Sequence, residues 1–188
     1  MINKLNSIIV LTILIGVIYV NYKSFISSPF QAALLQDWNK QSYRLPLDLI
    51  EQVDLDFPNI SVTTIPLKLL KGRYYKNIDS IDLALNYYHE SLKINPYLKI
   101  VESQLSLLYF DIEEYDSAYH YGKDAFLFYP DNNVHRHAYF QSLVNRRDSI
   151  ELDKSFELIR NKQNESHWIE YLLSNNNNDE CLHNRLDA

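Results

Sequence analysis

The chain has 188 residues, with 18 lysines and arginines against 24 aspartates and glutamates and a formal net charge of −6. Its 3 glycines are too few for the glycine-rich phosphate loops of nucleotide-binding folds, and its 1 cysteine cannot form an internal disulfide or a multi-cysteine zinc site. The acidic balance argues against a nucleic-acid partner, because a phosphate-binding face needs clustered basic residues. We therefore expect a folded protein without a cofactor or nucleic-acid partner, for which an apolar fraction of 46% is ample.

An apolar segment near the N-terminus is the first predicted element. Residues 5–22 carry no charge and lie between Lys4 and Lys23. As a helix, this segment would be about 27 Å long, close to the hydrocarbon thickness of a bilayer. Tyr19 and Tyr22 would lie at the membrane interface, with the two lysines as flanking anchors. The sequence predicts an N-terminal membrane anchor over residues 1–28.

A cleaved signal peptide is the alternative interpretation of this segment, because its apolar stretch is short enough for a signal peptide. Cleavage after Ser28 or after Ala33 would place Ile26 or Gln31 where a small residue is preferred. The flanking charges do not fix the orientation. Since a short N-terminal tail is more easily retained than a folded body, we expect a single-pass protein whose body is exported to the periplasmic side of a bacterial inner membrane.

The body of the chain contains an internal repeat of 34 residues. Residues 65–98 align with residues 99–132 without a gap, and the identical positions are Tyr75/Tyr109, Ile78/Ile112, Asp82/Asp116, Ala84/Ala118, Tyr87/Tyr121 and Pro96/Pro130. In the first unit, Gly72 permits a close crossing with a second helix that presents Ala84, and Pro96 ends that helix because proline lacks an N–H. The equivalent residues of the second unit are Ser106, Ala118 and Pro130.

These residues give the chain its resemblance to the tetratricopeptide repeat family, whose unit is a helix-turn-helix of about 34 residues. The first unit matches the family pattern at Gly72, Tyr75, Ala84, Tyr88 and Pro96. The second matches at Leu105, Ser106, Tyr109, Ala118, Ala125 and Pro130 but has Gly122 where the family prefers an aromatic residue. The resemblance implies an all-α fold, a short tetratricopeptide-type helix-turn-helix solenoid over residues 29–173 that follows one transmembrane helix.

Two degenerate units, residues 29–64 and 133–164, complete this expected domain. Their helices are predicted over residues 29–43, 45–56, 132–145 and 149–161, with Asp131 as the N-cap of the third. A short capping helix is expected over residues 165–173, and the asparagine-rich tail 174–188 is expected to be disordered.

No residue pattern indicates a catalytic or metal site. His135 and His137 are two residues apart and would point to different faces of a helix, and no acidic cluster with ligand spacing accompanies them. A serine nucleophile motif and a carboxylate pair are also lacking in the sequence. We therefore expect a protein that is not an enzyme.

The resemblance implies instead a concave groove, lined by the first helix of each unit, that binds an extended peptide or a partner helix. The residues at matching positions are Leu69, Arg73, Lys76, Ser103, Leu107, Phe110, His137 and Gln141. Leu107 and Phe110 would be apolar anchors for the partner. Arg73 and Lys76 could bind a carboxylate. In the alternative arrangement, the N-terminal helices cover part of this groove, including Leu69 and Leu107.

The first functional hypothesis is a membrane-anchored adaptor or scaffold that binds a protein partner in an envelope assembly. The layout is also similar, more weakly, to the exported tetratricopeptide tails of bacterial O-antigen ligase and polymerase-type proteins, through Trp38, Asn39, Tyr43, Asp56, Phe57 and Pro58. The alternative is a soluble exported protein with a structural or carrier role after signal-peptide cleavage.

Overall fold

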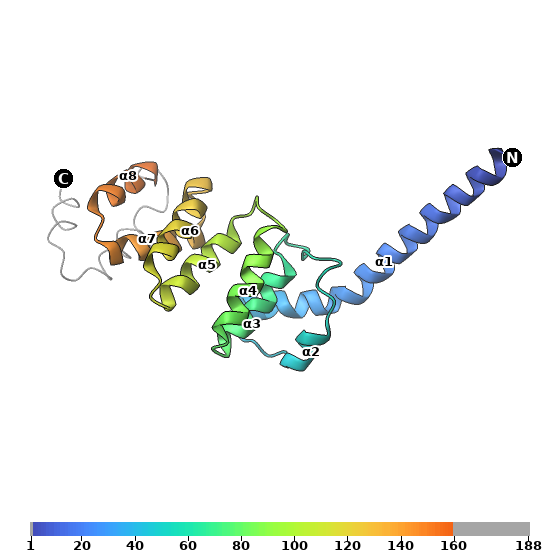
Figure 1. The fold of residues 1–188 in the computed structure, drawn as a ribbon, viewed down its shortest axis with the longest axis horizontal. Helices are drawn as coiled ribbons and strands as arrows, with labels where there is room; N and C mark the ends of the chain where they lie inside the picture. The colour runs from blue at the N-terminus through green and yellow to red at the C-terminus, as the bar shows by residue number, and fades with distance from the viewer. Residues whose placement is uncertain (1, 160–188) are drawn as a thin grey trace. The chain divides into compact units, whose positions relative to one another are not determined.

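The structure, a computed structural model, describes residues 2–159. Within this range every regular element is an α-helix, in the order α1 (Ile2–Lys40), α2 (Leu47–Gln52), α3 (Leu67–Asn77), α4 (Ile81–Leu92), α5 (Ile100–Asp111), α6 (Tyr115–Phe128), α7 (Asn133–Arg146) and α8 (Ser149–Ile159) (Figure 1). The chain divides into two compact units, unit 1 (Met1–Leu98) and unit 2 (Lys99–Ala188). The predicted all-α fold with a long apolar N-terminal helix is confirmed.

Helix α1 runs without interruption through Pro29, where the sequence predicted that a separate helix would begin. Proline removes one backbone hydrogen bond but has a φ angle compatible with a helix. The residues that follow, including Gln31, Leu34 and Asp37, are buried in unit 1 and hold the chain helical on that side. Figure 1 shows α1 changing direction before it reaches α3, as expected at a proline.

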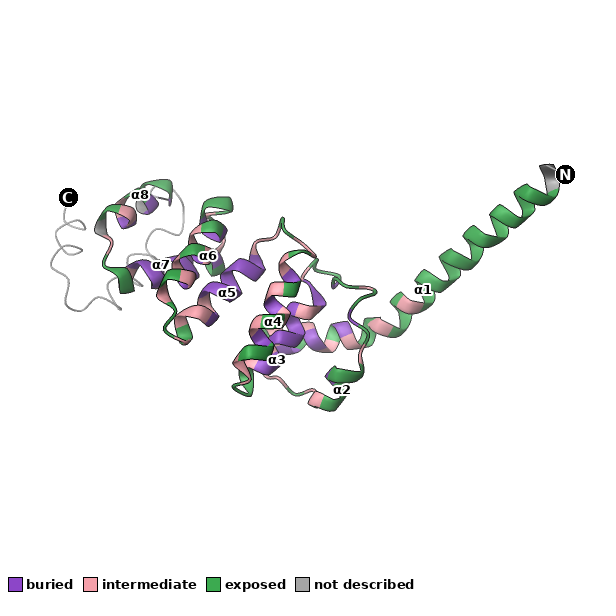
Figure 2. Cartoon of the chain, in the orientation of Figure 1, coloured by how far each residue is buried: buried purple, intermediate pink, exposed green. Residues whose placement is uncertain are grey.

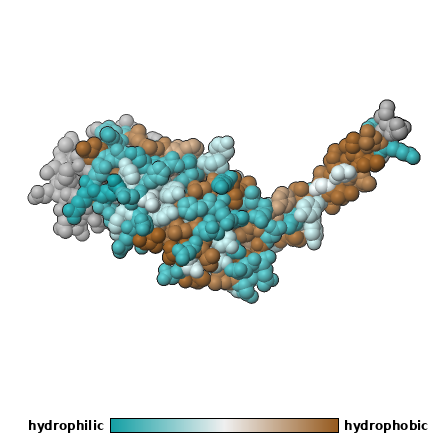
Figure 3. Space-filling view, viewed as in Figure 1, coloured by the Kyte–Doolittle hydropathy of each residue, from teal (hydrophilic) through white to brown (hydrophobic). Residues whose placement is uncertain are grey.

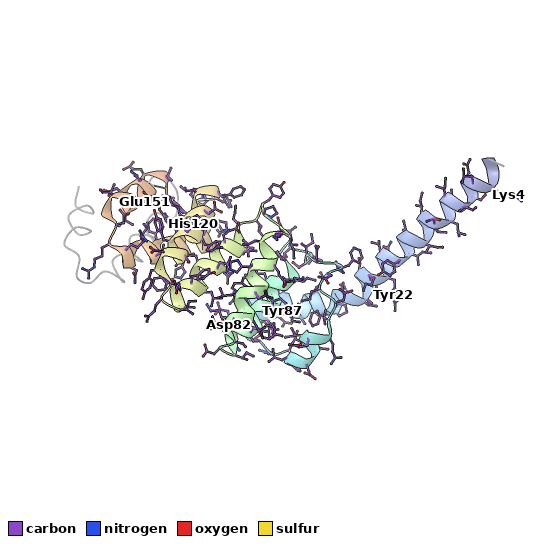
Figure 4. All side chains as sticks on the ribbon, in the orientation of Figure 1. Lys4, Tyr22, Asp82, Tyr87, His120 and Glu151 are labelled. Atoms are coloured by element: carbon purple, nitrogen blue, oxygen red, sulfur yellow. The ribbon has the colours of Figure 1, made fainter. Side chains whose placement is uncertain are left out.

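The first half of α1 is exposed, whereas its second half is partly buried (Figure 2). Side chains of high hydropathy cover this exposed half (Figure 3). It is the part of α1 between the labelled residues Lys4 and Tyr22 in Figure 4. Among the described residues, α1 is the helix that is long and apolar enough to cross a membrane.

The core of unit 1 joins the second half of α1 to α2, α3 and the loops between them. Its buried residues are Leu34, Ile50, Leu55, Leu67, Leu70 and Tyr74. Helix α2 is shorter than the predicted helix over residues 45–56, because Val53 is already extended (φ −80°, ψ 130°). Pro58 also disfavours helical geometry at Phe57, the residue that precedes it.

The 34-residue period reappears in the backbone of the turns between helices. Asp79 between α3 and α4, Glu113 between α5 and α6, and Arg147 between α7 and α8 have φ angles of 62°, 65° and 52°. Each donates its backbone N–H to the carbonyl three residues earlier, at 3.1, 3.1 and 3.2 Å. The described part of the chain thus has three helix pairs with equivalent turns, although the identities in the sequence extend over only two of them.

Stacked tyrosines fill the same place in the first two helix pairs. Tyr75 of α3 stacks on Tyr87 of α4, with ring centroids 5.3 Å apart and an interplanar angle of 7°. Tyr109 of α5 stacks on Tyr121 of α6, with centroids 5.6 Å apart and an angle of 2°. The tyrosines that are identical between the two repeat units therefore form the same stacked pair in each unit.

The close crossings use the predicted small residues, but with partly different partners. A Cβ atom on Gly72 would lie 2.7 Å from the ring of Tyr88, so the neighbour that makes Gly72 necessary is an aromatic side chain. In unit 2, the Ser106 hydroxyl donates to the carbonyl of Ala118 at 2.7 Å, as the predicted crossing requires. A Cβ atom on Gly122 would lie 2.7 Å from the Ser106 Oγ and 2.9 Å from the Tyr139 Cα.

Helix α7 begins one residue later than predicted, and Asn132 is its N-cap in place of Asp131. The Asn132 side chain accepts hydrogen bonds from the backbone N–H groups of Val134 at 2.9 Å and His135 at 3.3 Å. Asparagine at this position satisfies N–H groups that the helix leaves unpaired. The predicted capping helix over residues 165–173 and the disordered tail 174–188 lie outside the described residues.

Candidate partner-binding face

Three of the eight predicted groove residues lie on α3 in unit 1. Leu69 is fully buried, so its side chain is not accessible to a partner. Arg73 is half-buried, with its guanidinium 4.4 Å from the centre of the Trp38 ring and 5.6 Å from that of Tyr43. It also donates a hydrogen bond to the Tyr43 hydroxyl. Trp38 and Tyr43 therefore contact the guanidinium that the sequence analysis assigned to a partner's carboxylate. Lys76, the third residue, is half-buried at the end of α3.

The other five predicted residues lie on α5 and α7, two helices of unit 2 that contact each other. Ser103 is fully buried and its hydroxyl donates to the carbonyl of Lys99 at 3.3 Å, so Ser103 serves the helix. The remaining residues keep accessible surface: Leu107, Phe110 and Gln141 are half-buried and His137 is exposed. We call these last four residues the α5–α7 patch.

The α5–α7 patch combines apolar side chains with polar ones. The Phe110 ring meets the edge of Tyr115, with centroids 5.4 Å apart, which limits the rotation of Phe110. Leu107 and Gln141 are 34 residues apart and so occupy the same position in successive helix pairs. The Gln141 side-chain oxygen is buried, and among the described residues no group donates a hydrogen bond to it. The accessible part of the patch is therefore apolar on α5, at Leu107 and Phe110, and polar on α7, at the exposed His137.

Asp37 ties α1 to the rest of unit 1, a role for which the sequence offered no signal. Its buried carboxylate accepts hydrogen bonds from the Ser42 hydroxyl at 2.7 Å, from the Arg44 N–H at 2.7 Å and from the Tyr74 hydroxyl. Burial raises the pKa of this carboxyl, but the hydrogen bonds outweigh burial, so the pKa lies below its ordinary value. Burial, followed by the bond to Asp37, raises the pKa of Tyr74.

A second polar network joins α6, α7 and α8 in unit 2. Glu151 of α8, labelled in Figure 4, accepts a hydrogen bond from the Tyr139 hydroxyl at 2.9 Å and pairs with Lys123 at 2.6 Å. The hydrogen bond from Lys123 lowers the pKa of Glu151, although burial opposes it. Arg146 lies 4.5 Å from the centre of the Tyr119 ring. The two Glu151 contacts fasten α8 to α6 and α7, whereas the Arg146–Tyr119 contact joins α7 to α6.

Unit 1 also has a polar hollow on its surface. It is lined by Asp56, Asn59, Lys68, Asn86, His89, Glu90, Leu92, Lys93 and Ile94. Lys68 pairs there with Asp56 at 3.0 Å and with Glu90 at 2.8 Å, so these side chains largely neutralise one another. Within residues 2–159, no group of three histidine, cysteine or acidic side chains is placed to hold a metal ion.

No family model matches this sequence, and comparison with curated proteins finds no match.

Proposed function

We propose that this protein is a membrane-anchored, tetratricopeptide-type adaptor or scaffold that binds a protein partner through the α5–α7 patch, in an envelope assembly. The observation that carries the proposal is the recurrence of the left-handed turn at Asp79, Glu113 and Arg147. Three helix pairs recur at one spacing along the chain, and about three repeats are the number that helical repeat proteins need for stability. Arrays of this kind present extended binding surfaces.

The continuity of α1 supports an uncleaved anchor over a soluble exported form. Cleavage after Ser28 or Ala33 would cut within this helix. It would also remove Lys23, which pairs with Asp54 at 2.5 Å, and Tyr19, whose ring stacks on Phe57. The segment before the cleavage positions therefore has contacts with unit 1 that a signal peptide would not need.

The chemistry of the α5–α7 patch favours a peptide or helix that carries an apolar anchor residue. Phe110 and Leu107 supply apolar area on one helix, one turn apart. His137 on α7 is exposed and gives a bound segment a polar group to contact, and a few polar groups beside apolar anchors are a common means of fixing orientation. Because Arg73 is already occupied by Trp38 and Tyr43, an acidic group on the partner is not required.

Site-specific crosslinking of the full-length protein in its native membrane tests the proposal. A photoreactive residue in place of Phe110 should capture one dominant envelope protein, identified by mass spectrometry. The same residue in place of Leu127, which is exposed on α6 of the same unit, is the matched control and should not capture it. Capture of the same proteins at both positions, or self-crosslinks alone, would contradict the proposal.

A double variant provides a second readout of the same surface. Leu107→Asp combined with Phe110→Asp should lower partner capture by about ten-fold or more, because charged groups replace the central apolar anchors. Far-UV circular dichroism should stay unchanged, since both positions are only half-buried. Capture at the unchanged level would show that the partner binds elsewhere.

A further inference from the structure

The loop between α2 and α3 lies against α1 at the end of the apolar segment. Asp54 pairs with Lys23 at 2.5 Å, and the ring of Phe57 stacks on Tyr19, with centroids 6.5 Å apart and an interplanar angle of 11°. A small crevice between α1 and the loop is lined by Lys23, Ile26, Ser27, Phe30, Val53, Asp54 and Phe57. Two independent contacts therefore fix the height of this loop along α1.

That height places Phe57 beside the predicted membrane-spanning segment. Tyr19 belongs to the uncharged stretch 5–22, and it lies four residues before Lys23. At a rise of about 1.5 Å per residue, the Tyr19 level is about 6 Å deeper than the Lys23 level. Phe57 must share the Tyr19 level because their rings are stacked, even though its own loop belongs to unit 1.

The surface around this point is apolar and exposed. Phe57 keeps 41% of its surface accessible, and Ile18 and Tyr22, within one turn of Tyr19 on α1, are also exposed. Large apolar side chains at the polar end of a membrane helix fit the headgroup–acyl boundary, where aromatic rings accumulate. The Lys23–Asp54 ion pair, one helical turn above, fits the more polar headgroup layer.

We infer that the loop formed by residues 53–60 is a second membrane contact of this chain, with Phe57 inserted in the headgroup–acyl boundary beside Tyr19. The inference rests on the proposed anchor and adds a surface contact that the anchor alone does not require. The partner of this loop is the bilayer that α1 crosses, because the stacking on Tyr19 holds Phe57 at the depth of the lipid around α1. The contact would restrict rotation of α1 about its axis and keep unit 1 at the membrane surface.

Depth-dependent quenching tests this inference on the full-length chain. Single-cysteine variants in a Cys181→Ser background carry an environment-sensitive fluorophore at Phe57→Cys, Ile13→Cys or Ile78→Cys. They are reconstituted in vesicles of phosphatidylcholine and phosphatidylglycerol that contain lipids with a nitroxide at either a shallow or a deep position. Ile78 is the matched control, because it is 49% exposed and follows α3, at the far end of this helix from the loop.

The shallow nitroxide should quench the Phe57 site about three-fold more than the Ile78 site, as expected for a side chain at the headgroup–acyl boundary. The deep nitroxide should quench the Ile13 site most. Quenching at Ile13 with equal, weak quenching at Phe57 and Ile78 would overturn the loop contact and leave the anchor standing. Absence of quenching at Ile13 would overturn the anchor and, with it, the loop contact.

Discussion

At the scale of single residues, the glycine that permits a close crossing lies on a different helix in each of the first two helix pairs. Gly72 and Tyr88 of the first pair correspond, 34 residues on, to Ser106 and Gly122 of the second. The glycine thus lies on the first helix, α3, in the first pair and on the second helix, α6, in the second pair. In unit 2, Tyr139 of α7 approaches Gly122 closely. A position that looked like a departure from the family pattern is thus a close helix crossing, because only glycine leaves room for a neighbouring backbone.

The variant Gly122→Ala should destabilise unit 2. Alanine favours a helix over glycine by about 1 kcal/mol, but overpacking against the Ser106 Oγ and the Tyr139 backbone costs about 1–3 kcal/mol, and backbone atoms cannot rotate away. We expect a net loss of up to about 2 kcal/mol, measured by native-state hydrogen exchange in α5 to α7. Gly16→Ala is the control, since a Cβ atom there has nothing within 4 Å. Unchanged exchange in Gly122→Ala would show that this crossing is looser than described.

Asp37 should make the docking of α1 in unit 1 sensitive to acid. The folded pKa of this carboxyl lies below its unfolded value of about 3.9, so its contribution to stability is complete above that value and is lost as the pH falls through the folded pKa. Asp37→Asn should cost about 1–3 kcal/mol near neutral pH and should flatten the dependence below about pH 4. Hydrogen exchange across residues 31–38 measures both effects, with Asp82→Asn, which changes an exposed carboxyl on α4, as the control. A variant that keeps the wild-type acid dependence would assign it to another group.

At the scale of elements, each helix pair depends on a left-handed residue at its turn. The turns at Asp79 and Glu113 share a further backbone hydrogen bond. The N–H of Ser80 donates to the carbonyl of Tyr75 at 2.8 Å, and the N–H of Glu114 donates to the carbonyl of Tyr109 at 2.9 Å. These bonds satisfy carbonyls that the ends of α3 and α5 leave unpaired. Each of the three turns therefore needs a positive φ angle, and in all three the residue that adopts it is not glycine.

Glycine at these positions should stabilise the protein. Left-handed geometry costs an ordinary residue about 1–2 kcal/mol, whereas glycine loses only the extra entropy of its unfolded state. Glu113→Gly should raise the free energy of unfolding by up to about 1 kcal/mol, with smaller or equal gains for Asp79→Gly and Arg147→Gly, measured in urea. Asp82→Gly in the first turn of α4 is the control and should lower it by about 0.5–1 kcal/mol, because it removes an acidic side chain from a helix N-terminus and introduces glycine. A loss at Glu113 comparable to the loss at Asp82 would contradict the assigned turn.

At the scale of the whole molecule, the anchor and unit 1 form one folded piece of chain. The second half of α1 contributes Leu34 to the core of unit 1 and Asp37 to its polar network. The first half meets the loop before α3 through Tyr19 and Lys23. A membrane position of α1 would therefore be transmitted to unit 1 through packed contacts and not through a flexible linker, while the α5–α7 patch belongs to unit 2.

For the candidate site, the sequence placed the residues on helices but could not say which of them are accessible. The assignment of Leu69 and Ser103 to a binding surface fails on their burial, and the free cation expected at Arg73 is covered by Trp38 and Tyr43. Arg73 and Trp38 are 35 residues apart, and helical periodicity does not report which distant ring a guanidinium meets. Leu107, Phe110, His137 and Gln141 keep accessible surface.

The sequence by itself determined that the chain is helical, that an apolar helix comes first, and where the turns recur, because periodicity, glycine, proline and tyrosine spacing are local signals. Tertiary structure decided that α1 continues through Pro29, that Asn132 caps α7, and that Tyr88 faces Gly72. It also decided that Phe57 stacks on Tyr19 and that Asp37 gathers the hydrogen bonds of unit 1. Most of these outcomes depend on burial and on contacts between residues far apart in the chain, where packing overrides local preference.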